Sequence, residues 1–265
     1  MIELRNVTKY YPVKSGVRYI LRDVTLEIPS STNLAVLGPN GAGKSTFLRL
    51  IAGTEIVNQG NIRSNKSISW PLGIGNGFQA SLTGRQNVMF ACRINGLSTS
   101  QKRQVIDEVM EFAELGEYFD LPLMTYSSGM RARLSFGLSM AFEFDVYLID
   151  ELTSVGDAIF RAKAKQAFDN LRTRASIIFV SHNLQTLRES CNSALFLHDG
   201  TAAYFSDIES GIRAYEAYIL ANRMEHADEL QAIEKALRHE NRKLRIENKE
   251  KRIAKHSSNP PDPEG

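Results

Sequence analysis

A glycine-rich stretch, GPNGAGKST at residues 38–46, has the composition of a phosphate-binding turn. Its three glycines would let the main chain approach an anion and turn its N–H groups toward phosphate oxygens. Lys44 would place a compact positive charge on the β- and γ-phosphates, and the Ser45 hydroxyl could ligate Mg²⁺. The pattern fits a P-loop, which predicts nucleoside triphosphate binding without choosing between ATP and GTP. The residues expected around the phosphates are Gly38, Pro39, Asn40, Gly41, Ala42, Gly43, Lys44, Ser45 and Thr46.

The segments on either side of this stretch are those that a phosphate-binding turn requires. NLAVLG (33–38) is a short apolar run that ends in glycine, typical of a buried strand. KSTFLRLIAG (44–53) predicts a helix that Gly53 closes, and its positive N-terminus would point at the same anion. A glycine-rich turn without a ligand is the alternative, and the placement of strand and helix disfavours it.

Two adjacent carboxylates follow a second apolar run, VYLID at residues 146–150. A strand there would deliver Asp150 to the phosphate side of the sheet, where it could hold the hydration shell of Mg²⁺. Glu151 could orient or deprotonate an attacking water. A solvated strand end would look the same in isolation, but the P-loop upstream favours the catalytic interpretation.

The other strand candidates predict the class of fold. Residues 2–7 and 19–28 alternate polar and apolar side chains, as half-buried strands do, and residues 177–182 form a further buried-strand candidate. ALFLHDGTAAYF (194–205) predicts a hairpin with its turn at Asp199-Gly200. Buried apolar strands between helices favour an α/β core with a largely parallel sheet.

Two segments depart from this α/β pattern. Residues 83–142 carry helical patterns and no clear strand, which indicates a helical insert between two halves of the core. From residue 222 onward helix formers and charged residues dominate, which predicts a charged helical extension with a disordered end, SSNPPDPEG (257–265). We therefore expect a main domain over residues 1–221 and an extension over residues 222–265.

Composition limits the partners and the cellular compartment that we expect for the protein. Lys and Arg number 32 against 30 Asp and Glu, a near-balance that does not predict a nucleic-acid partner. Cys92 and Cys191 form no metal-ligand spacing and no disulfide framework, so we expect buried thiols in a reducing compartment. The N-terminus has no signal-peptide run, and no stretch reaches the roughly 18 apolar residues of a membrane helix. We expect a cytosolic protein that reaches a membrane only through a partner.

Several short motifs occur in a characteristic order along the chain. They are the P-loop, Gln79 in GFQASLTG, a Ser-Gly run at residues 127–129, Asp150 and Glu151, Asp157 in TSVGDA, and His182 in VSHN. This order resembles the ATP-binding subunit of ABC transporters over roughly residues 1–215. The resemblance implies an ATPase with an antiparallel β subdomain and a helical insert beside the P-loop core.

The resemblance also implies a role for each matched residue. Tyr11 matches the aromatic side chain that stacks on adenine, with Tyr10 the less favoured choice, and such stacking would favour ATP. Gln79 matches the residue that contacts Mg²⁺ and the attacking water and couples the site to a membrane subunit. His182 matches the switch residue on the γ-phosphate, and Asp157 lies in the segment that crosses the dimer interface.

The run TYSSGMRARL (125–134) could by itself be a serine-nucleophile turn, a surface loop or an anion-binding helix start. It lacks the G-x-S-x-G pattern of a nucleophile elbow. It falls where the family carries its signature, LSGGQ, so Ser127, Ser128 and Gly129 would clamp the γ-phosphate held by a partner subunit. A homodimer with two ATP molecules at its interface follows from this resemblance. The positions that depart from the signature are Tyr126, Ser128 and Met130.

Two longer stretches, at residues 126–142 and 151–160, resemble the subfamily of ABC ATPases that export cell-surface polysaccharides, such as capsule, O-antigen and teichoic acid. A third stretch, at residues 67–88, resembles more closely the Gram-negative capsular polysaccharide export ATPases. That resemblance implies a peripheral subunit on the cytoplasmic face of the inner membrane. It also implies a separate integral membrane permease that makes most of the contact with the polysaccharide, and periplasmic and outer-membrane export proteins. Exporters of O-antigen, teichoic acid or another surface glycan are the alternative, and a soluble ABC ATPase or a regulatory nucleotide switch is less favoured.

The extension is strongly basic in one part. Residues 235–255 contain nine Lys or Arg against three Glu. A solvated charged helix is the preferred interpretation. Contact with an anionic membrane leaflet or with an acidic polymer is the sharper hypothesis.

Overall fold

The computed structural model describes residues 1–14, 16–71, 78–150 and 158–222. The chain forms two compact units, Met1–Tyr215 and Glu216–Gly265. Residues 216–222 of the second unit are helical. The basic segment of the predicted extension lies outside the described residues.

A three-stranded antiparallel sheet has the order β2-β1-β4. Its strands are β1 (Ile2–Val13), β2 (Gly16–Ile28) and β4 (Gln59–Ser64). β1 and β2 extend the two predicted half-buried strands, whereas β4 was not predicted from the sequence. The reason is its place at the sheet edge: in QGNIRS only Ile62 is half-buried and the other five residues are exposed, so no alternation marks the strand.

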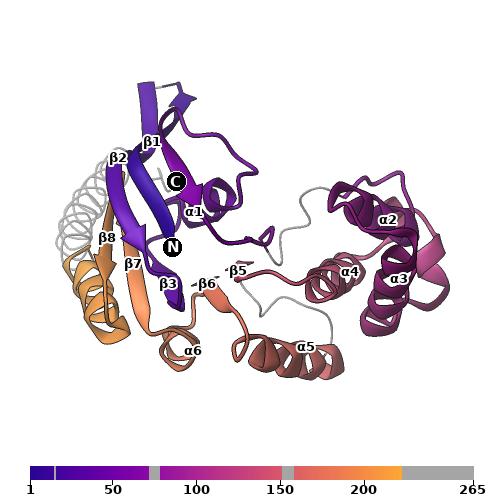
Figure 1. Cartoon of the computed structure of the whole chain (residues 1–265). Helices are drawn as coiled ribbons and strands as arrows, with labels where there is room; N and C mark the ends of the chain where they lie inside the picture. Colours follow the sequence, from indigo (N-terminus) through magenta and orange to yellow (C-terminus); the bar gives the residue numbers. More distant parts are fainter. Residues whose placement is uncertain (15, 72–77, 151–157, 223–265) are drawn as a thin grey trace, which may run out of the picture. The chain divides into compact units, whose positions relative to one another are not determined.

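A five-stranded sheet has the order β5-β6-β3-β7-β8 (Figure 1). Its strands are β3 (Leu34–Leu37), β5 (Val146–Asp150), β6 (Ser176–Val180), β7 (Ser193–His198) and β8 (Thr201–Phe205). The first four are parallel and β8 returns antiparallel to β7. The predicted hairpin turn is confirmed, because Asp199 (φ 43°) and Gly200 (φ 77°) both adopt the left-handed conformation that a two-residue turn needs.

Both faces of this sheet are covered, which is why its strands read as continuous apolar runs. Helix α1 (Lys44–Ile51) and the antiparallel sheet cover one face, and helices α5 (Ala158–Leu171) and α6 (Leu184–Ser190) cover the other (Figure 1). The strand residues on the α1 side are Leu34, Val36, Val146, Leu148, Ile178, Val180, Leu195 and Leu197. Those on the α5 and α6 side are Ala35, Leu37, Tyr147, Ile149, Ile177, Phe179 and Ala194.

The helical insert has its own apolar cluster. Its elements are α2 (Gly84–Ile94), α3 (Thr99–Ala113), η1 (Gly116–Asp120), η2 (Leu123–Thr125) and α4 (Ser128–Met140). Capping boxes begin α2 at Thr83 and α3 at Ser98, and Val88, Val109 and Phe119 are fully buried between the helices. The predicted α/β core with an antiparallel subdomain and a helical insert is therefore confirmed.

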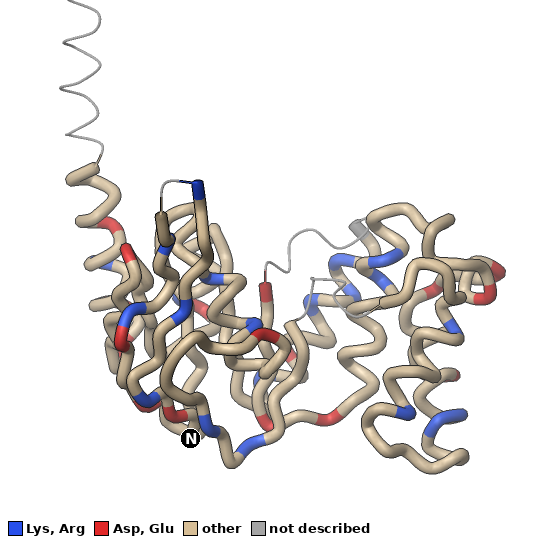
Figure 2. The backbone as a smooth tube through the Cα atoms, turned by 90° about the horizontal axis from the view of Figure 1, so that it is seen from above, with Lys and Arg blue, Asp and Glu red and all other residues tan. Residues whose placement is uncertain are grey.

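The surface charges are mixed, in line with the near-balance in composition. Figure 2 shows Lys and Arg interspersed with Asp and Glu along the described chain. Within the described ranges, every helix is too short or too polar to span a lipid bilayer.

Candidate functional site

The turn between β3 and α1 is built on glycines that no larger residue could replace without movement. Gly38, Gly41 and Gly43 have φ angles of 150°, 79° and 98°, a region that side-chain-bearing residues rarely adopt. A Cβ atom on Gly38 would lie 2.4 Å from the Leu197 carbonyl oxygen, and one on Gly43 would lie 2.3 Å from Cγ2 of Ile20. The main chain of the predicted P-loop is therefore held tightly against neighbouring strands.

The charged and hydroxyl groups of this turn stand at the start of α1. The Lys44 ammonium donates to the carbonyl oxygens of Gly38 (2.7 Å) and Pro39 (3.0 Å), so it lies across the turn. The N-cap residue Gly43 has no side chain to cap the first N–H groups of α1, and the half-buried Ser45 lies in that first turn. A helix N-terminus without a side-chain cap, beside an ammonium group, makes an anion-binding arrangement.

We predict that Gly43→Ala lowers nucleotide affinity by at least about tenfold, because its Cβ would force Ile20 or the turn to move. Gly53→Ala is the matched control at the other end of α1. Gly53 also has a left-handed φ, 69°, but no atom lies within 4 Å of its built Cβ. The control is expected to cost about 1 kcal/mol of stability and to leave affinity unchanged. Titration with a fluorescent ATP analogue measures the affinity of both variants. Equal affinities of Gly43→Ala and Gly53→Ala would contradict the prediction.

Asp150 and His182 lie at the same edge of the parallel sheet as the P-loop. Asp150 is the half-buried last residue of β5 and pairs with Val180, the last residue of β6, and β3 runs parallel beside β6. His182 is exposed and follows β6 by two residues, next to Asn183, which caps α6. The structure thus brings these two predicted residues toward the P-loop edge. Glu151 and Asp157 lie outside the described residues.

Tyr11 is near the end of β1 and is linked to the P-loop through its neighbour on β2. Its Cα partner across the sheet is Arg18, whose guanidinium donates to the Gly41 carbonyl oxygen at 2.6 Å. Tyr10 instead pairs its ring with that of Tyr19, with centroids 5.7 Å apart. Arg18 was not singled out from the sequence, because its partner is 23 positions away and no local pattern marks it.

The Tyr11 hydroxyl is anchored by a carboxylate. It donates to Glu55, which also accepts from Lys9 (2.9 Å) and from Arg49 (2.9 Å). Desolvation raises the pKa of Glu55, but the hydrogen bonds from Tyr11, Lys9 and Arg49 outweigh it and hold that pKa at about 2. Glu55 therefore stays ionised and keeps the Tyr11 ring in one position.

The predicted signature begins helix α4. Ser127 is the N-cap residue, and its Oγ accepts a hydrogen bond from the Met130 N–H at 3.2 Å, which leaves its own O–H available to donate. Ser127 and Ser128 are exposed, and Gly129 is half-buried in the first turn. These three residues belong to the helical insert, whereas the P-loop belongs to the sheet core.

The departure from the family pattern at Tyr126 has a structural reason. The Tyr126 side chain is buried in the cluster of the insert, and its hydroxyl donates to the Tyr118 carbonyl oxygen at 2.6 Å. A Cβ on Gly84 would lie 2.5 Å from that hydroxyl, so the tyrosine fills the space that the glycine leaves. Tyr126 thus packs the insert.

Gln79 presents an exposed side chain, while its main chain is hydrogen-bonded to the buried side chain of Asn87 in α2. Asn87 was also missed in the sequence. A polar residue four positions after the helix cap Thr83 reads from the sequence as an ordinary helix residue, so no local signal marks it.

Oxygen donors for Mg²⁺ are available among the predicted site residues: Ser45 and Asp150 lie at the P-loop edge, and Gln79 lies on the loop that is hydrogen-bonded to the helical insert. The predicted ligands Ser45, Gln79 and Asp150 offer a hydroxyl, an amide oxygen and a carboxylate, the hard donors that Mg²⁺ accepts while it keeps several waters. Over the described parts of the chain, no group of three or more His, Cys, Asp or Glu side chains could hold a metal ion. The chemistry of the three predicted donors fits Mg²⁺ that is shared with phosphate oxygens.

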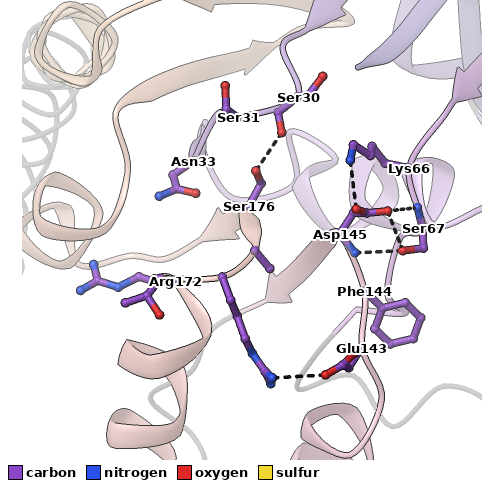
Figure 3. A pocket seen from close by; sticks show the side chains of 13 residues that line it. Ser30, Ser31, Asn33, Lys66, Ser67, Glu143, Phe144, Asp145, Arg172 and Ser176 are labelled. Carbon is purple, nitrogen blue, oxygen red and sulfur yellow. Dashed lines mark hydrogen bonds and ion pairs between the residues drawn. The ribbon is translucent and has the colours of Figure 1, made fainter.

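A polar pocket of about 560 Å³ lies at the other edge of the sheet (Figure 3). It is lined by residues at the amino ends of β3, β5 and β6, including Asn33, Asp145 and Ser176, and by none of the predicted site residues. The Asp145 carboxylate accepts from the Lys66 ammonium (3.0 Å) and from the Ser67 N–H and hydroxyl (both 2.9 Å). These hydrogen bonds lower the pKa of Asp145 to about 2. These hydrogen bonds join the segment that follows β4 to the segment that precedes β5, which indicates a structural role for this part of the pocket.

The fold and the P-loop edge together define a P-loop ATPase of the ATP-binding cassette type. A solved dimeric ATP-binding cassette in a post-hydrolysis state, bound to ADP and phosphate, has a TM-score of 0.66 at 22% identity, covering 78% of this chain and 99% of that chain. The family model for ABC transporters matches residues 21–154. The chain belongs to the ABC transporter family.

Curated relatives differ in how similar they are to this chain. The polysialic acid transport ATP-binding protein KpsT of Escherichia coli is 48% identical over 82% of this chain and 97% of its own length. The capsule polysaccharide export ATP-binding protein CtrD of Neisseria meningitidis is 42% identical over 82% of this chain and 98% of its own. An O-antigen export system ATP-binding protein of Klebsiella pneumoniae is more distant, at 33% identity over 78% of this chain and 85% of its own.

Proposed function

We propose that this chain is the ATP-hydrolysing subunit of an exporter that moves capsular polysaccharide across the inner membrane with a separate permease. The observation that carries the proposal is the likeness to KpsT and CtrD, which spans nearly their whole length and exceeds the likeness to the O-antigen protein. Residues 1–221 would form the ATPase, docked peripherally on the cytoplasmic face of the membrane. Periplasmic and outer-membrane export proteins would complete the path.

In the proposed mechanism, ATP is held between the two parts of the sheet core. Tyr11 would stack on adenine, which favours ATP, and the glycine turn with Lys44 would receive the phosphates. Ser45, Gln79 and Asp150 would hold Mg²⁺, which supplies charge neutralisation at the β- and γ-phosphates when bound. The hydrogen bonds of Glu55 support this arrangement, because they hold the Tyr11 ring beside the strand that carries Arg18.

Hydrolysis would be completed by a second copy of the chain. Glu151 would accept a proton from the attacking water, and His182 would contact the γ-phosphate. Ser127, Ser128 and Gly129 of the partner copy would clamp the same phosphate group. That Ser127 caps α4 with its lone pair, and keeps its proton to donate, supports this role. Closure of the dimer around two ATP molecules would pull on the permease near Gln79 and the helical insert.

The proposed function is tested by deleting the gene in its source organism and restoring it as the wild-type chain or as Lys44→Ala. Without the active chain, capsular polymer is expected to accumulate inside the cell and to disappear from the surface, and only the wild-type chain should restore it. Fractionation of surface and intracellular polymer measures this. If the surface capsule persisted while lipid-linked O-antigen or another glycan was retained, the alternative exporter class would replace the proposal.

A further inference from the structure

A buried amide side chain in the helical insert holds the loop that carries Gln79. Asn87 of α2 is 2% exposed, next to the fully buried Val88. A buried amide needs partners for its oxygen and for its two N–H groups, because an unpaired polar group away from water is costly. The hydrogen-bond partners of the Asn87 amide therefore indicate its role.

The Asn87 side chain is hydrogen-bonded to both main-chain groups of Gln79. Its Oδ1 accepts from the Gln79 N–H at 2.8 Å, and its Nδ2 donates to the Gln79 carbonyl oxygen at 3.1 Å. The same Nδ2 lies 3.2 Å and 2.9 Å from the carbonyl oxygens of Leu82 and Thr83. One side of the amide thus meets a donor and the other meets three acceptors, so its orientation is determined.

Main-chain hydrogen bonds hold the same loop from its other side. Met124 donates to the Ala80 carbonyl oxygen at 2.9 Å, and Leu123 donates to that of Leu82 at 3.0 Å. Because Leu123 and Met124 belong to η2, shortly before the α4 cap Ser127, the Gln79 loop and the signature segment are joined by short contacts. The contacts from η2 are made by the main chain, whereas those from Asn87 are made by a side chain that a substitution can remove.

We propose that Asn87 is a positioning residue for Gln79: it fixes the main chain at Gln79 to the helical insert, so that the exposed Gln79 side chain is presented from one defined place. This inference rests on the proposed role of Gln79 in contacting Mg²⁺ and the attacking water. A carboxamide that must reach a metal-bound water is sensitive to displacement of its own backbone by about 1 Å. Asn87 acts on the reaction through Gln79 and touches no substrate.

The test is a double-substitution cycle in the purified full-length chain, with steady-state hydrolysis of Mg²⁺–ATP as the readout. Asn87→Ala is expected to lower kcat by on the order of tenfold and to raise the Mg²⁺ concentration for half-maximal rate, while KM for ATP changes less than about twofold. Combined with Gln79→Ala, it is expected to add nothing further, because the residue that it positions is gone. Asn95→Ala is the matched control, since Asn95 lies at the end of the same helix and donates only to Ala91 among its described contacts.

Each outcome decides the inference. Full additivity with Gln79→Ala, or an Asn95→Ala variant with the same loss, would show a general effect on folding and overturn it. If Asn87→Ala does not fold, the cycle is run with Asn87→Ser, and failure of both to fold would likewise assign Asn87 a structural role only. If the wild-type chain hydrolysed no ATP with or without its permease, the proposed function would fail instead, so the two failures are distinguishable.

Discussion

Replacing Lys44 by Ala is expected to lower ATP affinity by about a hundredfold or more and to abolish hydrolysis. The Lys44 ammonium already lies across the turn, 2.7 Å from the Gly38 carbonyl oxygen and 3.0 Å from that of Pro39. The variant removes the positive charge that faces the phosphates while the glycine backbone of the turn is unchanged. Equilibrium titration with a fluorescent ATP analogue gives the affinity, and phosphate release gives the rate.

Lys66→Ala is the matched control for Lys44→Ala. The Lys66 ammonium pairs with Asp145 at 3.0 Å in the pocket at the opposite edge of the sheet. Loss of that partly exposed ion pair is expected to leave both the stability of the fold and ATP binding close to those of the wild type. Normal ATP affinity in Lys44→Ala would show that the turn at residues 38–45 is not the nucleotide site.

The second large effect is expected from Glu151→Gln. This residue follows Asp150, the last residue of β5, and glutamine keeps its size but cannot accept a proton from water at neutral pH. We expect hydrolysis to fall by about 10²- to 10⁴-fold with ATP affinity retained, and the ATP-bound dimer to accumulate. Single-turnover hydrolysis measures the first effect, and light scattering with Mg²⁺–ATP measures the second.

Glu143→Gln controls for the loss of a carboxylate near the opposite end of the same strand. Glu143 precedes β5, its side chain is 91% exposed, and it lies 3.6 Å from Arg174. Such a surface pair contributes little, so the control should hydrolyse ATP at the wild-type rate. A wild-type rate in Glu151→Gln itself would rule Glu151 out as the base.

Local patterns were sufficient wherever the chemistry or the conformation is local. The hairpin turn at Asp199-Gly200 was predicted because two left-handed residues need those residue types. β3 and α1 were predicted because an apolar run, a glycine turn and a helix start follow one another directly. β4 was missed because only one side chain of this edge strand is half-buried and the others are exposed, so the sequence shows no alternation.

Residues whose role depends on a distant partner could not be predicted in this way. Arg18 reaches Gly41 across 23 positions, and Tyr126, which lies between η2 and α4, fills the space left by Gly84 of α2. Asn87 contacts Gln79 across only eight positions, yet its amide reads from the sequence as an ordinary polar helix residue. Its meaning appears only when its burial and its partners are known.

By itself the sequence determined the P-loop, the α/β class and the order of the motifs, because glycine placement and apolar runs are properties of short segments. Only the tertiary structure decided that the P-loop, Asp150 and His182 share one sheet edge, since parallel pairing joins strands that lie more than a hundred positions apart, such as β3 and β6. It also decided that Tyr126 packs the insert and that Asn87 holds Gln79. Those roles are set by hydrogen bonds and contacts in space, which residue type and local spacing do not encode.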